Sequence, residues 1–174
     1  MDCEILRQRE YNGDMSIAIC PGSYDPITFG HLDVIERTSK MFDEVVVLVA
    51  HNAKKKYLFT DDERLASARE ALAFLPNIRV ELIDGLVAEY AKSIRADAIV
   101  KGLRGPADYD AEQAMALLNR HLSGVETIFV MGSSTLMHVA SSFVKDVALH
   151  GGPIRDLVPV NVARLLEEKV KNNG

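Results

Sequence analysis

The sequence predicts an α/β protein, a single domain with a Rossmann-like, doubly wound, five-stranded parallel sheet and helices on both faces. Five short apolar segments alternate with stretches whose apolar residues recur at helical spacing, a pattern typical of repeated strand and helix units. Parallel strands require crossover connections, and the intervening helices supply them. No internal repeat, low-complexity tract or linker interrupts the series, and 174 residues suffice for one domain.

The first strand and the first helix enclose the most informative loop of the chain. Residues 17–20 form an uninterrupted apolar run, typical of a strand buried on both faces, and Pro21 and Gly22 break it. From residue 32 to residue 42 the apolar side chains recur at helical spacing. Acidic residues lie near the start of this stretch and Lys40 lies near its end, as a helix dipole prefers. The predicted order is therefore strand, tight loop, helix.

The later elements follow the same alternation. We expect the remaining strands at residues 44–50, 78–83, 98–100 and 126–131. We expect the remaining helices at about residues 60–75, 86–95, 109–122, 135–149 and 160–171. Thr60 and Glu63 form a predicted capping box, Gly124 is a predicted helix stop, and residues 101–108 are expected to be a loop. Residues 1–14 are polar and lack periodicity, so we expect a mobile extension before a domain at residues 15–174.

Composition excludes several classes of protein. The net charge of −5, from 20 basic and 25 acidic residues, argues against broad binding to nucleic acid or to an anionic membrane. No apolar run approaches the roughly 20 residues that span a bilayer, and the N-terminus lacks the layout of a signal peptide, so we expect a cytoplasmic protein. Two cysteines, Cys3 and Cys20, make neither a disulfide framework nor a zinc site, and Cys20 is expected in the core.

The loop after the first strand carries the groups that hold phosphate. Its position presents unpaired backbone N–H groups at the positive end of a helix dipole. Ser23 and Thr28 add hydroxyls, Gly22 and Gly30 allow a ligand to approach the backbone, and His31 lies at the first turn. These groups are typical of a site that binds nucleotide phosphates without a lysine-bearing P-loop. The alternative is an ordinary strand-to-helix turn with a histidine at the surface.

Other loops at the same edge of the sheet carry compatible groups, because the carboxyl ends of parallel strands share one edge. The candidates are basic or hydroxyl-bearing and follow the second, fourth and fifth strands: Lys54, Lys55, Lys56, Lys101, Arg104, Ser133, Ser134, Ser141 and Ser142. On an acidic chain, this edge is predicted to bind a polyanion. Each group has an alternative interpretation. Residues 54–56 could be a solvated charge run, residues 101–105 a plain turn, and Ser141 and Ser142 mid-helix serines without a role. The other histidines show no metal-ligand spacing and are expected to be structural or at the surface: His51, His121, His138 and His150.

Missing motifs narrow the class of reaction. The chain has no Walker A motif, no dinucleotide fingerprint, no kinase signature set and no serine nucleophile elbow. Nucleotidyl transfer needs none of them, because a substrate phosphate with a second pKa of about 6 is already largely ionised at neutral pH. It can attack the α-phosphorus of ATP without a protein base. The protein must then align two phosphates and stabilise the charge of the transition state.

The same residues carry a resemblance to a known family. Residues 28–31, Thr-Phe-Gly-His, resemble the T/H-x-G-H signature of the nucleotidylyltransferase superfamily. Residues 21–31, Pro-Gly-Ser-Tyr-Asp-Pro-Ile-Thr-Phe-Gly-His, are similar to the segment that opens the bacterial phosphopantetheine adenylyltransferases. Further similar blocks follow in order, so the resemblance covers about residue 15 to the C-terminus: residues 54–56, 59–60, 63–64, 100–104, 107–109, 112, 119–122 and 141–145.

The resemblance implies a reaction and a set of site residues. ATP and pantetheine 4′-phosphate would give dephospho-coenzyme A and pyrophosphate, with Mg²⁺ on the ATP phosphates, a homohexameric assembly and coenzyme A as a candidate feedback ligand. His31, Lys55 and Arg104 would be catalytic, with Ser23 between both substrates. The ATP site would comprise Ser23, Tyr24, His31, Gly102, Leu103, Arg104, Glu112, Leu136, Met137, His138, Val139, Ala140, Ser141 and Ser142. The acceptor site would comprise Ser23, Lys55, Val87 and Lys101. No protein ligand for a metal is implied.

Three positions depart from the commoner family pattern. Ser23 often appears there as threonine and Lys101 as arginine; both keep a donor, although lysine loses the bidentate fork. Ala140 stands where a hydroxyl is usual, which implies one hydrogen bond fewer to ATP.

Two other functions and one related fold are alternatives to a phosphopantetheine adenylyltransferase. A nucleotidylyltransferase acting on nicotinamide mononucleotide or glycerol 3-phosphate predicts histidine in place of Thr28 and a different basic loop. A nucleotide-binding module without turnover predicts the loss of His31 or Arg104, and both are present. A fragment of a class I aminoacyl-tRNA synthetase shares the fold, but this chain is too short and lacks a K-M-S-K-S-like loop.

Overall fold

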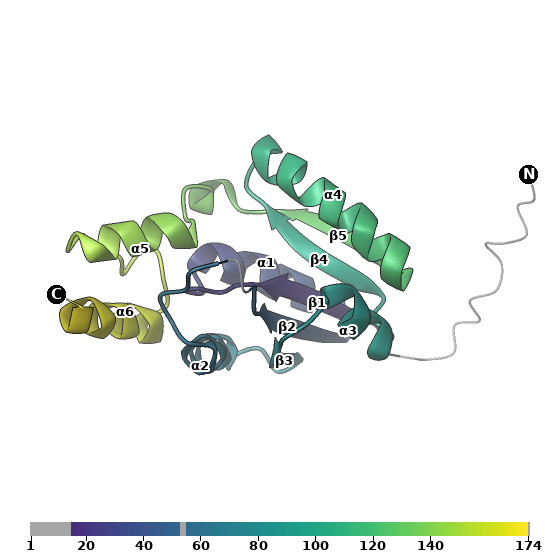
Figure 1. The fold of residues 1–174 in the computed structure, drawn as a ribbon, viewed down its shortest axis with the longest axis horizontal. Coiled ribbons are helices and arrows are strands. Elements are labelled where there is room, and N and C mark those ends of the chain that lie inside the picture. The colour runs from purple at the N-terminus through teal and green to yellow at the C-terminus, as the bar shows by residue number, and fades with distance from the viewer. Residues whose placement is uncertain (1–14, 53–54, 174) are drawn as a thin grey trace, which may run out of the picture.

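The computed structural model describes residues 15–52 and 55–173, and it contains one five-stranded parallel sheet (Figure 1). The strands are β1 (Ile17–Gly22), β2 (Glu44–Ala50), β3 (Ile78–Ile83), β4 (Ala98–Leu103) and β5 (Glu126–Met131). Their order is β3-β2-β1-β4-β5, so the order reverses between β1 and β4. The predicted fold class is confirmed. The predicted extension at residues 1–14 and Lys54 lie outside the described residues.

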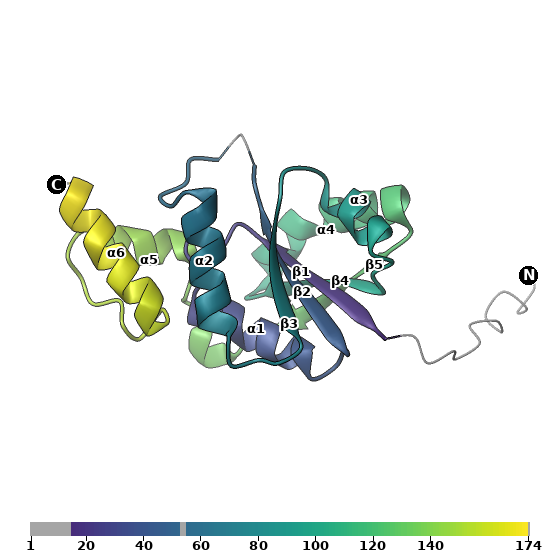
Figure 2. The ribbon, with the colours of Figure 1, turned by 90° about the horizontal axis from the view of Figure 1, so that it is seen from below.

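Helices cover both faces of the sheet. α1 (Phe29–Ser39), α2 (Asp61–Leu72), α5 (Ser141–Leu149) and α6 (Val160–Asn173) lie on one side, and α3 (Val87–Ser93) and α4 (Pro106–Ser123) lie on the other. Figure 2 shows α2, α5 and α6 to the left of the sheet and α3 at its upper right. Within the described ranges, no helix combines the length and the apolar character needed to cross a bilayer.

Alternating side chains of the strands divide the core into two layers. Ala18 and Cys20 of β1 face the larger cluster beneath α1 and α2, whereas Ile19 between them faces the smaller cluster beneath α3. A strand covered on both faces needs an apolar side chain at every position, which explains the uninterrupted runs in β1 and β2. β3 and β5 lie at the edges of the sheet and are only partly buried. Cys20 is 2% exposed, so its predicted place in the core is confirmed.

The predicted end of the fourth strand was wrong. β4 continues to Leu103, through the residues expected to begin a loop, because Lys101 and Gly102 pair with Phe129 and Val130 of β5. Gly102 also allows α1 to pack closely, since a Cβ atom there would lie 2.8 Å from Cγ2 of Val34. α4 begins at Pro106, three residues earlier than predicted, because proline is favoured at the first helical position.

The predicted start of the helix at residues 135–149 was also wrong, although its end at residue 149 is confirmed. The chain instead forms a short 3₁₀ turn, η1 (Ser134–Leu136), then extends through Ala140, and α5 starts at Ser141. The Ser141 hydroxyl donates to the Pro26 carbonyl over 2.9 Å, a tertiary contact that local propensity does not report. Ser141 and Ser142 therefore begin a helix rather than lying in the middle of one. The capping box of Thr60 and Glu63 and the left-handed Gly124 after α4 are confirmed.

The close packing at Gly102 predicts a stability loss for Gly102→Ala. The new methyl group would meet the branched end of Val34 at 2.8 Å, so the free energy of unfolding should fall by about 1–3 kcal/mol, as in other overpacked cores. Urea unfolding monitored by circular dichroism measures this change. Gly85→Ala is the control, because no atom lies within 4 Å of the added methyl group there. Equal stability of the two variants would contradict the packing role of Gly102.

Candidate active site

A cleft of about 540 Å³ opens beyond the carboxyl ends of β1 and β4, where the strand order reverses. This is the position at which open parallel sheets bind ligands. Its walls come from the loop after β1, the start of α1, the segment before α2, the end of β4, the first turns of α4 and the start of α5. Segments far apart in the chain thus meet at one edge, as the sequence predicted.

His31 is held at the start of α1 by contacts on two sides. The Thr28 backbone N–H donates to Nδ1 of His31 over 3.0 Å, which makes Nδ1 an acceptor. The Tyr24 ring packs edge-on against the imidazole, with centroids 5.1 Å apart. The Tyr24 hydroxyl in turn donates to the Cys20 carbonyl over 2.7 Å, so the ring beneath His31 is itself anchored. With Nδ1 occupied, the proton of a neutral imidazole lies on Nε2.

His31 is uncharged at neutral pH. Loss of hydration in the protein, together with the nearby charges of Arg104 and Lys101, lowers the pKa of His31 to about 4. The imidazole is therefore a hydrogen-bond donor through Nε2, and the positive charge of the cleft comes from lysine and arginine.

The two cations at the end of β4 are each paired with a carboxylate of α4. Lys101 Nζ lies 3.2 Å from Glu112 Oε2. Arg104 makes two side-chain bonds of 2.9 Å to Asp108, whose Oδ2 also accepts from the Arg104 backbone N–H. The hydrogen bonds from Arg104 lower the pKa of Asp108, and those to Asp108 raise the pKa of Arg104. Both cations are thus oriented at the cleft, where a phosphate can compete with the carboxylates.

A buried carboxylate ties three segments of the cleft together. Asp25, only 4% exposed, follows β1 and accepts backbone N–H groups of Leu58 and Phe59, over 3.1 Å and 3.0 Å. It also accepts from Lys145 Nζ of α5 over 2.5 Å. Its charge is satisfied by a cation and by amides, as burial requires. Asp25 therefore joins the loop after β1 to the start of α2 and to α5.

Two further walls carry donors. Lys55 Nζ lies 3.4 Å from Ser23 Oγ, and both residues line the cleft. At the opposite wall, Ala140 is the N-cap of α5 and provides no side-chain cap. The first amides of α5 are therefore left for water or an anion. Alanine at this position removes a hydroxyl but keeps the helix N-terminus available.

The structure gathers most predicted residues around this cleft. Those that line it are Gly22, Ser23, Tyr24, Thr28, Gly30, His31, Lys55, Lys56, Lys101, Gly102, Leu103, Arg104, Glu112, Ser133, Leu136, Val139, Ala140, Ser141 and Ser142. Four predicted residues lie elsewhere: Val87 packs in the smaller apolar cluster, and Ser134, Met137 and His138 are exposed outside the lining. His51 pairs with Asp61, whereas His121 and His150 are exposed.

Sequence reasoning did not assign Asp25, Asp108 or Lys145 to the site. Asp108 had a usable signal, because it follows Arg104 by four residues at the start of a helix, the spacing of a helical ion pair. Asp25 and Lys145 had none, since the two partners are 120 positions apart in the chain. Only the assembled sheet brings them together.

Comparisons of the sequence with known proteins agree with this geometry. Residues 19–147 match the model of the cytidylyltransferase-like family. A phosphopantetheine adenylyltransferase of Bifidobacterium animalis subsp. lactis is 51% identical over 159 residues, which cover 90% of this chain and 100% of the relative. A phosphopantetheine adenylyltransferase of Bifidobacterium longum is 50% identical over 156 residues, which cover 88% of this chain and 94% of the relative.

Solved structures are similar in fold. A protein from Vibrio parahaemolyticus, provisionally described as a nicotinate-nucleotide adenylyltransferase, superposes with a TM-score of 0.70 at 18% identity, covering 92% of this chain and 98% of that chain. A lipopolysaccharide core biosynthesis protein from Thermoplasma volcanium gives a TM-score of 0.52 at 23% identity, covering 69% and 98%. At these identities the likeness concerns the fold alone.

The lowered pKa of His31 predicts an acid-dependent loss of stability. An unfolded histidine binds a proton near pH 6.5, whereas folded His31 does so only near pH 4. Between these values the unfolded state holds more protons, so stability must fall as the pH falls. Urea unfolding of the wild type and of His31→Gln from pH 7.5 to 4 tests this. The free energy of unfolding of the wild type minus that of the variant should shrink towards pH 4. A difference independent of pH would contradict a lowered pKa of His31.

Proposed function

The chain belongs to the cytidylyltransferase-like family and, within it, to the phosphopantetheine adenylyltransferases, and from this membership we propose the reaction of its cleft. The enzyme transfers the adenylyl group of ATP to pantetheine 4′-phosphate, giving dephospho-coenzyme A and pyrophosphate, a step of coenzyme A biosynthesis. The observation that carries the proposal is the convergence of His31, Lys55, Lys101 and Arg104 on one cleft at the reversal of strand order.

The proposed chemistry is a direct displacement without a covalent enzyme intermediate. An oxygen of the acceptor phosphate attacks the α-phosphorus of ATP in line, and the bond from that phosphorus to the β-phosphate oxygen breaks, so that pyrophosphate leaves. No protein base is required, because a phosphate with a second pKa of about 6 is largely ionised at pH 7. The cleft supplies alignment and charge stabilisation.

The geometry supports a division of labour among the proposed residues. His31 donates through Nε2 to the α-phosphate as charge develops there, and Tyr24 supports the ring from below. Arg104 and the start of α5 take the ATP phosphates, with Gly102, Leu103, Glu112, Leu136, Val139 and Ala140 around the nucleotide. Lys101 and Lys55 take the acceptor phosphate, with Ser23 between the substrates. We retain Val87, Met137 and His138 as contacts for the distal parts of the substrates.

Magnesium enters this proposal on the nucleotide. In the part of the chain that the structure describes, no group of three or more histidine, cysteine, aspartate or glutamate side chains is placed to hold a metal ion. Two carboxylates that line the cleft, Asp108 and Glu112, are engaged by Arg104 and Lys101. This donor set fits a cation that is carried by the ATP phosphates and water, as Mg²⁺ commonly is. Its contribution there is to neutralise phosphate charge.

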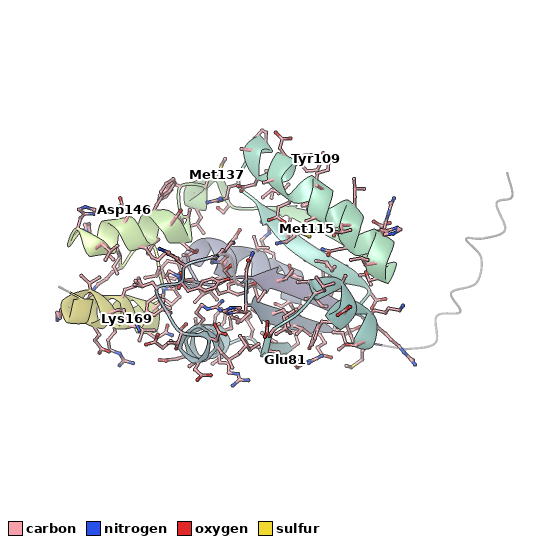
Figure 3. All side chains as sticks on the ribbon, in the orientation of Figure 1. Glu81, Tyr109, Met115, Met137, Asp146 and Lys169 are labelled. Carbon is pink, nitrogen blue, oxygen red and sulfur yellow. The ribbon has the colours of Figure 1, made fainter. Side chains whose placement is uncertain are left out.

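The apolar face of α4 and β5 supports a homohexamer. Several large apolar side chains on these elements are exposed: Tyr109, Met115, Leu117, Leu118, Leu122, Ile128 and Met131 (Tyr109 and Met115 are labelled on α4 in Figure 3). Contiguous exposed apolar surface of this kind usually marks a contact with another protein.

We further propose that the enzyme works in the cytoplasm. Coenzyme A, which contains the pantetheine phosphate group, would be a feedback ligand of the same cleft.

His31→Ala tests the reaction and the site together. The measurement is pyrophosphate release from ATP and Mg²⁺, with and without pantetheine 4′-phosphate. The wild type should release pyrophosphate only with the acceptor, and the variant should turn over about 10²-fold more slowly, because it loses one donor to the transition state. His150→Ala, which removes an exposed histidine far from the cleft lining, is the control. No release by the wild type would refute the acceptor, and nicotinamide mononucleotide and glycerol 3-phosphate would then be tested.

Lys55→Ala tests the basic segment after β2. The acceptor KM should rise and kcat/KM should fall by about 10-fold or more, because a charge-assisted bond to the acceptor phosphate is lost. Steady-state kinetics with varied pantetheine 4′-phosphate measure both values. Lys40→Ala removes an exposed lysine that is paired with Glu36 on α1, and it should leave both values unchanged. An unaltered acceptor KM in Lys55→Ala would place Lys55 in a solvated charge run.

A further inference from the structure

Arg64, in the first turns of α2, is the largest fully buried side chain in the described part of the chain. Arginine is almost never fully buried unless its charge is paired, because the guanidinium loses its hydration. Arg64 does not line the cleft, so substrate binding does not explain its burial. Its partners must explain it.

The partners of Arg64 come from the ends of two strands and the start of a helix. Nη1 donates to the Ser23 carbonyl after β1, over 2.5 Å, and to the Ala50 carbonyl at the end of β2, over 3.2 Å. Nη2 donates to Asp61 Oδ1 over 2.6 Å, and the guanidinium carbon lies 4.1 Å from the centre of the Tyr57 ring. One planar group therefore joins two loops of the cleft to α2.

These contacts fix both ends of the segment that carries Lys55. The segment leaves β2 at Ala50, whose carbonyl binds Arg64, and returns at Tyr57, whose ring lies against the same guanidinium. The Tyr57 hydroxyl also accepts the Asn52 backbone N–H over 2.9 Å. In the neighbouring loop, after β1, the carbonyl of Ser23 is held by the same nitrogen of Arg64 that binds Ala50.

Stability alone is a weak reason for this arrangement. Buried ion pairs are often no more stabilising than apolar side chains of the same size. The single carboxylate partner, Asp61, is 37% exposed, and within the described residues Nε of Arg64 has no hydrogen-bond partner. What only arginine supplies at this point is a rigid fork that reaches two backbone carbonyls and a carboxylate at once.

We propose that Arg64 is a positioning residue, which sets the position of Ser23 relative to Lys55 at the cleft by binding the backbones of both loops. This inference rests on the proposed function, in which Ser23 and Lys55 hold the acceptor phosphate. Arg64 acts through these two residues and touches neither substrate. A displacement of the order of 1 Å at such groups is enough to slow a reaction substantially.

The first experiment compares Arg64→Met and Arg64→Lys with the control Arg69→Met. Arg69 lies on the same helix and binds the Val80 carbonyl of β3, remote from the cleft lining. Arg64→Met should lower kcat/KM for the acceptor by about 10-fold. Arg64→Lys should lose less, because it keeps the charge but not the fork. Arg69→Met should stay within about twofold of the wild type.

The second experiment asks whether Arg64 acts through Lys55. In a Lys55→Ala background, Arg64→Met should cost only about twofold in kcat/KM, because Lys55, one of the two residues that it positions, is already absent and only the effect through Ser23 remains. Residues that act independently would instead show the full loss of about 10-fold again. Full additivity of the two substitutions would overturn the proposed coupling.

A third readout is independent of catalysis. Trypsin cleavage of the native protein after Lys55 and Lys56, mapped by mass spectrometry, reports how readily this segment opens. Cleavage should be about fivefold faster in Arg64→Met and unchanged in Arg69→Met. Unchanged cleavage in folded Arg64→Met would overturn the inference, and if that variant does not fold, Arg64→Lys gives the same test. An inactive wild type would refute the proposed function, whereas the cleavage rates would still decide the anchoring.

Discussion

The site depends on the reversal of strand order between β1 and β4. From β1 the chain builds outward through β2 to β3, with α1 and α2 on one face, and it then crosses to β4 and builds outward to β5, with α3 and α4 on the other face. Right-handed crossovers require this change of face when the direction of growth reverses. No crossover then covers the carboxyl ends of β1 and β4, and the cleft lies there.

Charge in this cleft is organised by pairing. The chain has a net charge of −5, yet Lys101 and Arg104 are held at the cleft by Glu112 and Asp108. Surface pairs of this kind contribute little to stability, so their main effect is to keep two cations in place until a phosphate competes for them. His31 stays neutral because it is half-buried and lies near those cations, which leaves it as a donor without adding repulsion.

Two buried charges hold the loops that carry the chemistry. Asp25 binds the amides before α2 and Lys145 of α5, and Arg64 binds the carbonyls after β1 and at the end of β2. One is an acceptor for backbone N–H groups, and the other is a donor to backbone carbonyls. Together they satisfy polar backbone groups that irregular loops would otherwise bury without partners. Loop geometry at the cleft therefore depends on core electrostatics as well as on apolar packing.

The sequence by itself determined the fold class, the bounds of β2, β3 and β5, and most of the residues around the cleft, because apolar periodicity and strand-end position are local properties. It did not determine where β4 ends or where α5 begins, since pairing with β5 and the Ser141 contact to Pro26 override local propensity there. Tertiary structure alone decided the partners of Asp25 and Arg64 and the neutral state of His31. All three features depend on burial and on groups that are distant in the chain, and the local pattern of residues reports neither of these causes.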